Sequence, residues 1–294
     1  MAGKNTLLQS DAMPVSQLWT FTAILVLLSF LADTLGIHAG ANIMTSRMIM
    51  WCPGAAAVAT CFLFGLSPQT LFGKNHPTLR ALVSSYLLPF AYAIPVYIVA
   101  WSWTEHAFAP QTFEQAIAGS YKLAAWPWLG TWGVGVPLLL TVGALSGLTW
   151  ALGEELGWRG FVVPRLMPRF GFAGTSVAIG LFWAAWHFPN LIWGDYNAGT
   201  NPVFAASCFT ITCVAMSFVM TWLRIATQSV WPCAVLHASH NLLIQAILDP
   251  LTANVERVRL FTTEFGVGLA VTICVAALFY WRRRAHLDNA CPGM

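Results

Sequence analysis

Three short stretches of this 294-residue chain place ionisable or amide side chains inside apolar runs. They read "LGEELGWRG", "FWAAWHFPNL" and "AVLHASHNLL". Burying such groups in an apolar span is costly, so by default they mark a functional site. The six candidate site residues are Glu154, Glu155, Arg159, His187, His237 and Asn241.

Helical geometry separates the two adjacent acids. Successive residues differ by about 100° around a helix axis, so Glu154 and Glu155 point in different directions. Glu155 and Arg159 are four residues apart, an acid-first order that favours an ion pair. This pairing leaves Glu154 as the free carboxylate, which suits a proton acceptor. Gly153 and Gly157 flank the acids and allow another helix to approach closely.

The third stretch carries two hydrogen-bond donors on one helix face. His237 and Asn241 are four residues apart, and both can donate to an oxygen that gains negative charge. His240 lies at the edge of that face, and its role is left open. His187 stands alone on its helix, with Asn190 nearly one turn later. Each group taken singly also fits a structural role, but three such groups on separate spans are hard to explain as packing.

The composition indicates which elements must position these residues. The chain is 57% hydrophobic and 9% charged, with a mean hydropathy of +0.66, whereas a soluble domain averages about 25% charged residues. A polytopic membrane protein is therefore expected. The net charge of +3 is too small to suggest nucleic-acid binding. The seven cysteines form no CxxC pair, so neither a disulfide framework nor a thiolate metal site is indicated.

Eight continuous apolar stretches approach the roughly 20 residues that a helix needs to cross a bilayer. We therefore expect an all-α bundle of about eight transmembrane helices, in one domain over 18–281, with tails at 1–17 and 282–294. The motif core runs from 150 to 245. The predicted spans lie near 18–37, 47–66, 81–104, 135–162, 172–193, 203–223, 229–248 and 263–281.

Basic residues predict the orientation of the bundle. With a cytoplasmic N-terminus, ten Lys and Arg residues fall in inside segments and four in outside segments. Both termini are therefore expected in the cytoplasm, for a multi-pass protein of a bacterial inner membrane. The external segment 105–127 could contain an interfacial helix. The ten are Lys4, Lys74, Arg80, Arg159, Arg165, Arg169, Arg224, Arg282, Arg283 and Arg284; the four are Arg47, Lys122, Arg257 and Arg259.

The order of the motifs resembles the CPBP family, the type II CAAX prenyl endopeptidases and bacteriocin-processing (Abi) membrane proteases. Its EExxxR motif matches at Glu154, Glu155 and Arg159, and its HxxxN motif at His237 and Asn241. Its FxxxH motif matches at His187 but departs at the aromatic position, where this chain has Trp183. The resemblance covers about 150–245.

This resemblance implies an intramembrane endopeptidase that uses a glutamate-activated water and no cofactor. By position, Glu154 would be the general base, and His187 would help to orient the water. His237 and Asn241 would form the oxyanion hole, supported by Glu155 and Arg159. The implied partners are the lipid bilayer and a peptide or protein substrate at the membrane. The sequence does not choose among prenylated tails, bacteriocin leaders and other substrates, nor does it indicate an oligomeric state.

Two other functions remain open from the same residues. The first is a zinc protease with Glu154, His187 and His237 as ligands and water as the fourth, a normal catalytic set, although no HExxH motif is present. The second is a non-catalytic proton-coupled carrier or a chaperone for membrane peptides.

Geometry sets one further expectation. His187 lies some fifteen residues into its span, about 22 Å from the cytoplasmic end at 1.5 Å per residue. For Glu154 to meet it, the fourth helix must continue to about Val163 and stop before Pro164. We therefore expect a cavity that opens to the cytoplasm and admits water and peptide.

Overall fold

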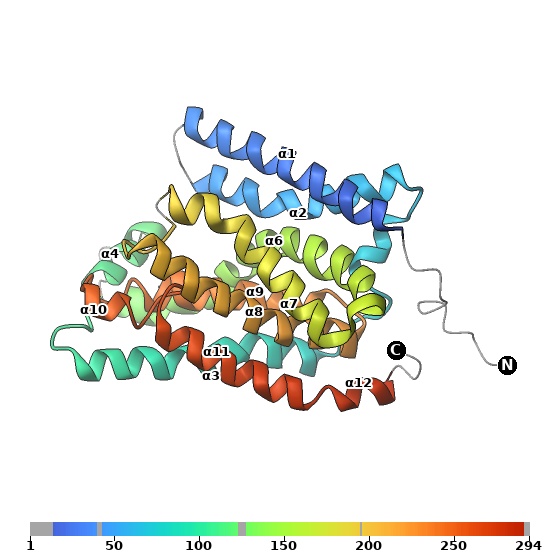
Figure 1. The fold of residues 1–294 in the computed structure, drawn as a ribbon. Helices are drawn as coiled ribbons and strands as arrows, with labels where there is room; N and C mark the ends of the chain where they lie inside the picture. The colour runs from blue at the N-terminus through green and yellow to red at the C-terminus, as the bar shows by residue number, and fades with distance from the viewer. Residues whose placement is uncertain (1–13, 40–42, 123–127, 195, 291–294) are drawn as a thin grey trace.

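The computed structural model describes residues 14–39, 43–122, 128–194 and 196–290, which form a bundle of helices (Figure 1). No strand occurs among these residues, and two isolated β-bridges join Gly73 to Ser229 and Phe108 to Thr252. The all-α class predicted from the apolar runs is confirmed. The first thirteen and the last four residues of the predicted tails lie outside the described part of the chain.

The N-terminal part consists of three long helices and one short amphipathic helix. Helices α1 (Val15–Ala39) and α2 (Ile43–Leu63) pack against each other, and a 3-10 turn, η1 (Pro68–Phe72), leads to α3 (Leu79–Trp103). Thr78 caps α3 because its side chain accepts a hydrogen bond from the Ala81 N–H. Helix α4 (Gln111–Tyr121) occupies the segment in which an interfacial helix was expected.

Residues 129–192 are helical almost throughout. The α-helical pieces are α5 (Val136–Leu138), α6 (Ala144–Glu155) and α7 (Val163–Ile192), and π-helical turns join them at η2 (Leu129–Gly135), η3 (Leu139–Gly143) and η4 (Leu156–Val162). At about 1.5 Å per residue this stretch is too long for one crossing. The chain turns back at Gly171, whose φ of 60° and ψ of −173° suit a residue without a Cβ.

The predicted helix end before Pro164 is therefore wrong. Pro164 lies in the first turn of α7, directly after the π-helical turn η4. A proline in a first turn removes an N–H that has no helical partner in any case, so the helix continues through it. The break comes seven residues later, at Gly171.

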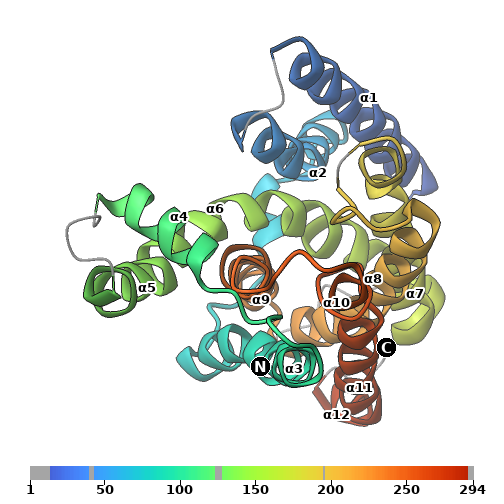
Figure 2. The same ribbon diagram turned by 90° about the vertical axis from the view of Figure 1, so that its left-hand side faces the viewer.

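The C-terminal part supplies the remaining site helices. It comprises α8 (Pro202–Thr227), α9 (Trp231–Leu243) with the π-helical turn η5 (Ile244–Leu248), the short α10 (Glu256–Arg259), α11 (Val267–Arg282) and α12 (Ala285–Ala290). Helix α8 packs extensively on α7 and α11, and α9 packs on α3 and α6. Figure 2 shows α9 surrounded by other helices when the bundle is viewed along its axis.

Each of the eight predicted spans corresponds to helix in the structure. By length and composition, four stretches of the described residues can cross a membrane: Val15–Leu35, Leu79–Trp103, Leu129–Ile192 and Pro202–Thr227. The third of these contains two predicted spans, and the other three predicted spans are the shorter α2, α9 with η5, and α11. The chain is an integral membrane protein by these helices.

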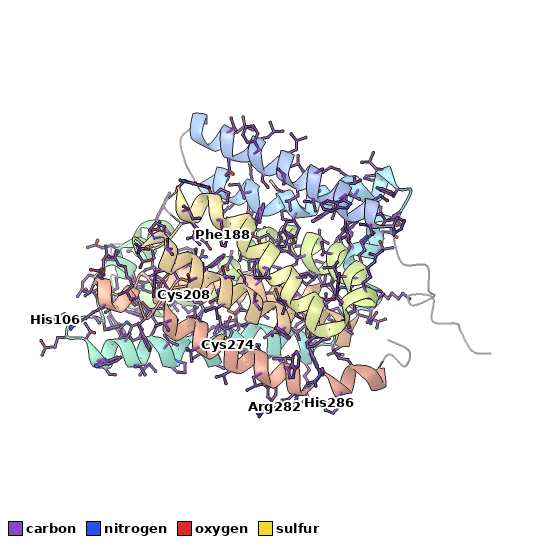
Figure 3. The ribbon with its side chains drawn as sticks, in the orientation of Figure 1. His106, Phe188, Cys208, Cys274, Arg282 and His286 are labelled. Atoms are coloured by element: carbon purple, nitrogen blue, oxygen red, sulfur yellow. The ribbon has the colours of Figure 1, made fainter. Side chains whose placement is uncertain are left out.

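The bundle has two distinct ends. The described chain begins and ends at one of them, whereas α4 and α10 lie at the other (Figure 1). Arg282 and His286 lie at the first end and His106 at the second (Figure 3). Below, the first is called the termini end and the second the far end.

Candidate active site

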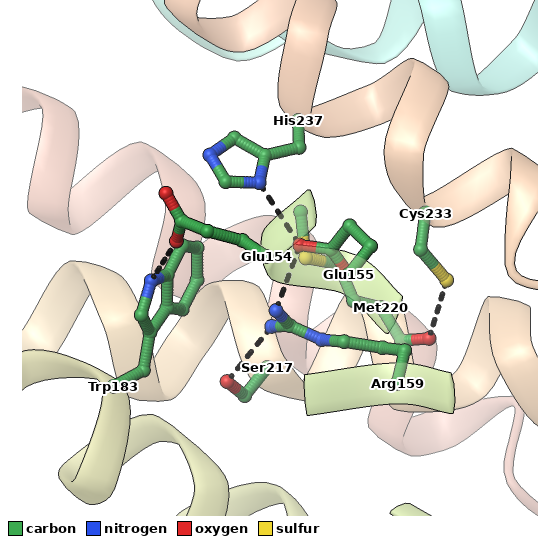
Figure 4. Close-up of polar contacts among 8 residues, drawn as sticks. All are labelled: Glu154, Glu155, Arg159, Trp183, Ser217, Met220, Cys233 and His237. Atoms are coloured by element: carbon green, nitrogen blue, oxygen red, sulfur yellow. Dashed lines mark hydrogen bonds and ion pairs between the residues drawn. The ribbon is translucent and has the colours of Figure 1, made fainter. Parts of the chain in front are cut away.

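Glu155 is the centre of a buried ion network. Its Oε1 accepts a hydrogen bond of 2.9 Å from Arg159 Nη1 and another of 2.9 Å from His237 Nδ1. The side chains of Glu155 and Arg159 are 0% exposed. The i,i+4 pair predicted from spacing is confirmed, and the contact with α9 adds a second partner (Figure 4).

Arg159 is fixed from several sides. Its Nη2 donates to Ser217 Oγ on α8 at 3.2 Å, and its guanidinium lies 4.6 Å from the centre of the Trp183 ring. Its backbone carbonyl accepts a 3.0 Å bond from Arg224 Nε. A cation over an indole face contributes about 0.5–2 kcal/mol. These contacts bind α8 and α7 to the π-helical turn that carries Arg159.

Glu154 points away from this ion network, toward α7. Its Oε2 accepts a 2.8 Å hydrogen bond from Trp183 Nε1, and its side chain is buried. The other carboxylate oxygen points away from Trp183 (Figure 4). Trp183 is the position at which the sequence departs from the FxxxH pattern. The indole provides a donor to the carboxylate that a phenylalanine could not provide.

The protonation of His237 follows from its partners. Because Glu155 accepts from Nδ1, that nitrogen carries a proton, and Nε2 can donate only if the ring is the imidazolium ion. With His237 charged, the four ionisable groups Glu154, Glu155, Arg159 and His237 sum to zero charge. A neutral set is less costly to bury than one with a net charge of −1. The network therefore favours the form of His237 that donates from both nitrogens.

His187 has the complementary arrangement. Its Nδ1 lies 3.1 Å from the backbone carbonyl of Trp183, which can only accept, so Nδ1 donates. In the neutral ring Nε2 then keeps a lone pair that can accept a hydrogen bond from water. The rings of Trp186, Tyr196 and Phe209 surround His187 and fix its plane.

One cavity of about 760 Å³ unites the predicted catalytic residues. Glu154, His187, His237 and Asn241 all line it, although they come from α6, α7 and α9. Glu155 and Arg159 do not line it; Glu155 binds His237 Nδ1, and Arg159 pairs with Glu155. The structure thus separates the six predicted residues into four that face the cavity and two that support them.

A second polar cluster in the cavity was missed from the sequence. Glu264 Oε1 lies 3.2 Å from His240 Nε2 and 2.9 Å from Gln245 Nε2, and its Oε2 accepts a 2.6 Å bond from the Tyr196 hydroxyl. His240 Nδ1 is also 2.7 Å from the Tyr92 hydroxyl. Two signals could have indicated this cluster. Glu264 is the one acid in the predicted last span, and Gln245 follows Asn241 by four residues on the same helix face.

The glycines beside the acids allow the expected close helix approach. A Cβ on Gly157 would lie 2.5 Å from the Cβ of Pro53, and one on Gly153 would lie 2.7 Å from the Met50 carbonyl oxygen. Both contacts are with α2, which therefore packs directly against the backbone that carries Glu154. This contact fixes the position of Glu154 and Glu155 along the axis of the bundle relative to α2.

The cavity extends from the catalytic residues toward one end of the bundle. Its lining reaches the far end of the bundle, opposite both termini, through residues such as Asn190, Trp193 and Gln245. The cytoplasmic termini and the cavity opening to the cytoplasm both stay predictions.

The residues that face the cavity include three possible metal ligands, Glu154, His187 and His237. Among the described residues, no group of three or more His, Cys, Asp and Glu side chains is arranged to hold a metal ion. Glu154 already uses one oxygen in a hydrogen bond with Trp183, and His237 uses one ring nitrogen in a hydrogen bond with Glu155.

Fold and site together define an integral membrane helix bundle with a buried Glu–His–His–Asn cavity. Comparison with known families agrees: residues 136–243 match the family described as type II CAAX prenyl endopeptidase Rce1-like. Over 73 residues the chain is also 30% identical to the CAAX prenyl protease 2 of Methanococcus maripaludis. The aligned segment covers 24% of this chain and 27% of that protein. The chain thus aligns with about a quarter of the length of this curated relative. Both matches agree with the resemblance that the three motifs predicted.

Proposed function

We propose that the protein is an intramembrane endopeptidase in which Glu154 activates a water molecule. One observation carries the proposal: Glu154, His187, His237 and Asn241 line one cavity, while Glu155 is held by Arg159 and His237. Glu154 has no ion-pair partner among the described residues, and it shares this cavity with the hydrogen-bonding groups needed for peptide hydrolysis.

The chemistry follows from the hydrogen-bond capacities of these groups. A water in the cavity donates one hydrogen bond to Glu154 and another to His187 Nε2. Glu154 takes a proton as the water oxygen bonds to the carbonyl carbon of the peptide. The carbonyl oxygen becomes negatively charged, and His237 Nε2–H and the Asn241 amide donate to it. Glu154 then gives the proton to the amide nitrogen as the C–N bond breaks, which yields a carboxylic acid and an amine.

The supporting residues act through His237 and the helix backbone. Glu155 stabilises the imidazolium form that donates to the oxyanion, and Arg159 compensates the charge of Glu155. Trp183 links the two acids. Its Nε1–H donates to Glu154, and its ring face contacts Arg159, the ion-pair partner of Glu155. Trp183 thus orients the Glu154 carboxylate, whereas the ion pairs of the site are made by Glu155.

The substrate class is proposed from the comparison. The name of the archaeal relative indicates a prenylated C-terminal peptide as a first probe. The apolar part of the cavity lining, which includes Met50, Trp186, Met216 and Met220, is compatible with an apolar peptide segment. A family of unmodified hydrophobic peptides is the second probe.

The test is peptide cleavage by purified protein in detergent micelles, with mass spectrometry of the fragments. The wild-type protein should release two fragments, and Glu154→Gln should release none while keeping its melting temperature. Glu105→Gln, which changes an exposed acid outside the cavity, is the matched control and should cleave normally. Cleavage by Glu154→Gln would refute the assigned base.

The same preparation separates the two alternatives. Activity that survives chelation supports the metal-free mechanism. Stoichiometric zinc that is lost together with activity would replace it with zinc held by Glu154, His187 and His237. Transport of a peptide or of protons by reconstituted protein without any cleavage would replace it with a carrier.

A further inference from the structure

Two amide side chains follow one another along the wall of the cavity. Asn241 lies in α9, and Gln245 comes four residues later in the π-helical turn η5. Both line the cavity that contains Glu154, and the proposed mechanism uses only Asn241. At 1.5 Å per residue their backbone positions are about 6 Å apart along the helix. Gln245 is therefore a polar group of the cavity that the reaction itself does not explain.

Glu264 fixes the orientation of the Gln245 amide. Its Oε1 lies 2.9 Å from Gln245 Nε2 and 3.2 Å from His240 Nε2. Its Oε2 accepts a 2.6 Å hydrogen bond from the Tyr196 hydroxyl. A carboxylate can only accept hydrogen bonds, so Gln245 must turn its NH2 group toward Glu264. The amide oxygen then occupies the other branch of the Gln245 side chain.

The amide oxygen of Gln245 receives no hydrogen bond from the part of the chain that the structure describes. Gln245 is an exposed residue of the cavity lining, although it lies beside the buried Glu264. An amide oxygen of this kind is an acceptor for a group that enters the cavity. The donor that nearly every residue of a polypeptide offers, whatever its side chain, is the backbone N–H.

The spacing of the two amides matches an extended peptide. In the proposed mechanism Asn241 donates to the carbonyl oxygen of the cleaved bond. In an extended chain a residue turns its C=O and its N–H to the same side, and the next residue turns both to the opposite side. Residues that face the same side are two positions apart, or about 6.8 Å at 3.4 Å per residue. This spacing agrees with the roughly 6 Å between Asn241 and Gln245.

We propose that Gln245 forms a main-chain subsite, in which its amide oxygen accepts a substrate N–H two residues from the residue whose carbonyl is attacked. The ligand class is an extended polypeptide segment that is recognised through its backbone and not through its side chains. Proline has no N–H, so a segment with proline at this position lacks the contact. The location relative to the cleaved bond rests on the proposed peptidase activity, whereas the binding itself needs no catalysis.

The test is a scan with fluorescent prenylated peptides in which backbone N–H groups are replaced one at a time by an ester oxygen. The ester removes the donor and keeps the shape of the chain. Dissociation constants are measured by fluorescence anisotropy with Glu154→Gln, which is expected to bind without cleaving. One ester, two residues from the attacked carbonyl, should weaken binding about 2- to 10-fold, as expected for the loss of one neutral hydrogen bond. Esters one position to either side of it face away from α9 and should have no such effect.

The assignment to Gln245 is tested by adding Gln245→Met, which keeps the length of the side chain and removes the amide. Glu264 retains its contacts with His240 and Tyr196 in this variant. The ester effect should disappear in Gln245→Met and persist in the control Gln115→Met, which changes an exposed glutamine of α4 outside the cavity. Gln245→Leu is a second variant, so that a folding defect in one does not decide the result.

Steady-state cleavage provides a second readout with Glu154 intact. Gln245→Met should raise KM by about the same 2- to 10-fold with little change in kcat, because the contact is present before and during the reaction. A fall in kcat with unchanged KM would refute a binding subsite.

The remaining outcomes separate the subsite from the peptidase activity. An ester effect that persists in both Gln245 variants, or no ester effect at any position, would refute the subsite. Cleavage with a normal KM in both variants would refute the subsite and leave the activity. The expected ester pattern without cleavage by the parent protein would refute the activity for this probe and support the subsite. No binding of any peptide would refute both.

Discussion

Glu155→Gln is expected to destabilise the protein strongly, whereas Glu154→Gln should leave its stability close to that of the parent. The two acids are adjacent in sequence, but the structure gives them different partners. Glu155 holds Arg159 and His237 through one oxygen at 2.9 Å each, and neither Glu155 nor Arg159 is exposed. Glu154 accepts one hydrogen bond from Trp183, which the carbonyl oxygen of a glutamine can also accept.

The magnitude follows from the cost of an orphan buried charge. Removal of one partner from a buried ion pair costs about 3–5 kcal/mol, because the remaining charge is left in low dielectric without compensation. At about 2 °C per kcal/mol for a chain of this size, the melting temperature of Glu155→Gln should fall by about 6–10 °C. Glu154→Gln leaves no unpaired cation, so its melting temperature should change by less than about 2 °C.

The assay compares purified variants in one detergent by thermal unfolding and by peptide cleavage. Both variants should lose cleavage, but only Glu155→Gln should lose stability. A double mutant adds an internal control: Glu155→Gln with Arg159→Met removes both charges and should be less destabilised than the sum of the single variants. Equal stability of Glu155→Gln and the parent, or a larger loss in Glu154→Gln, would refute the division of roles between the two acids.

Three further outcomes are expected. Asn241→Ala should lower kcat by about 100- to 1000-fold with little change in KM, because it removes one oxyanion donor; a pure KM effect measured by steady-state kinetics would contradict that role. Trp183→Phe keeps the ring but removes the donor to Glu154, and loss of a hydrogen bond to a charged group, about 1.5–3 kcal/mol, should reduce kcat by roughly 10- to 100-fold. Unchanged kcat would show that the bond does not position the base. Gly157→Ala should cost at least about 1–3 kcal/mol in thermal unfolding because its Cβ would lie 2.5 Å from α2, whereas Gly119→Ala, with no atom within 4 Å of the added Cβ, should be tolerated. Equal stability of these two variants would contradict the tight contact between α2 and η4.

The sequence by itself determined the features that depend on local spacing and composition. Apolar runs of span length predicted the helices, because a helix in lipid must satisfy its backbone within one segment. The four-residue spacing of Glu155 and Arg159 predicted their ion pair, since residues at i and i+4 meet on any α-helix. The three motifs in order also indicated a resemblance with which the family match over residues 136–243 agrees.

Only the tertiary structure decided which residues meet across helices. Glu154 and Trp183 are 29 positions apart, and His240 meets Glu264 across 24 positions, so neither contact follows from a helical period. These contacts depend on how each helix is rotated and how closely α2 approaches through Gly153 and Gly157. The site of the helix break depended on the conformation of Gly171 rather than on Pro164, because a proline after a π-helical turn interrupts no necessary hydrogen bond. The extent of the cavity was decided in the same way, by how the helices that carry its lining residues pack around Glu154.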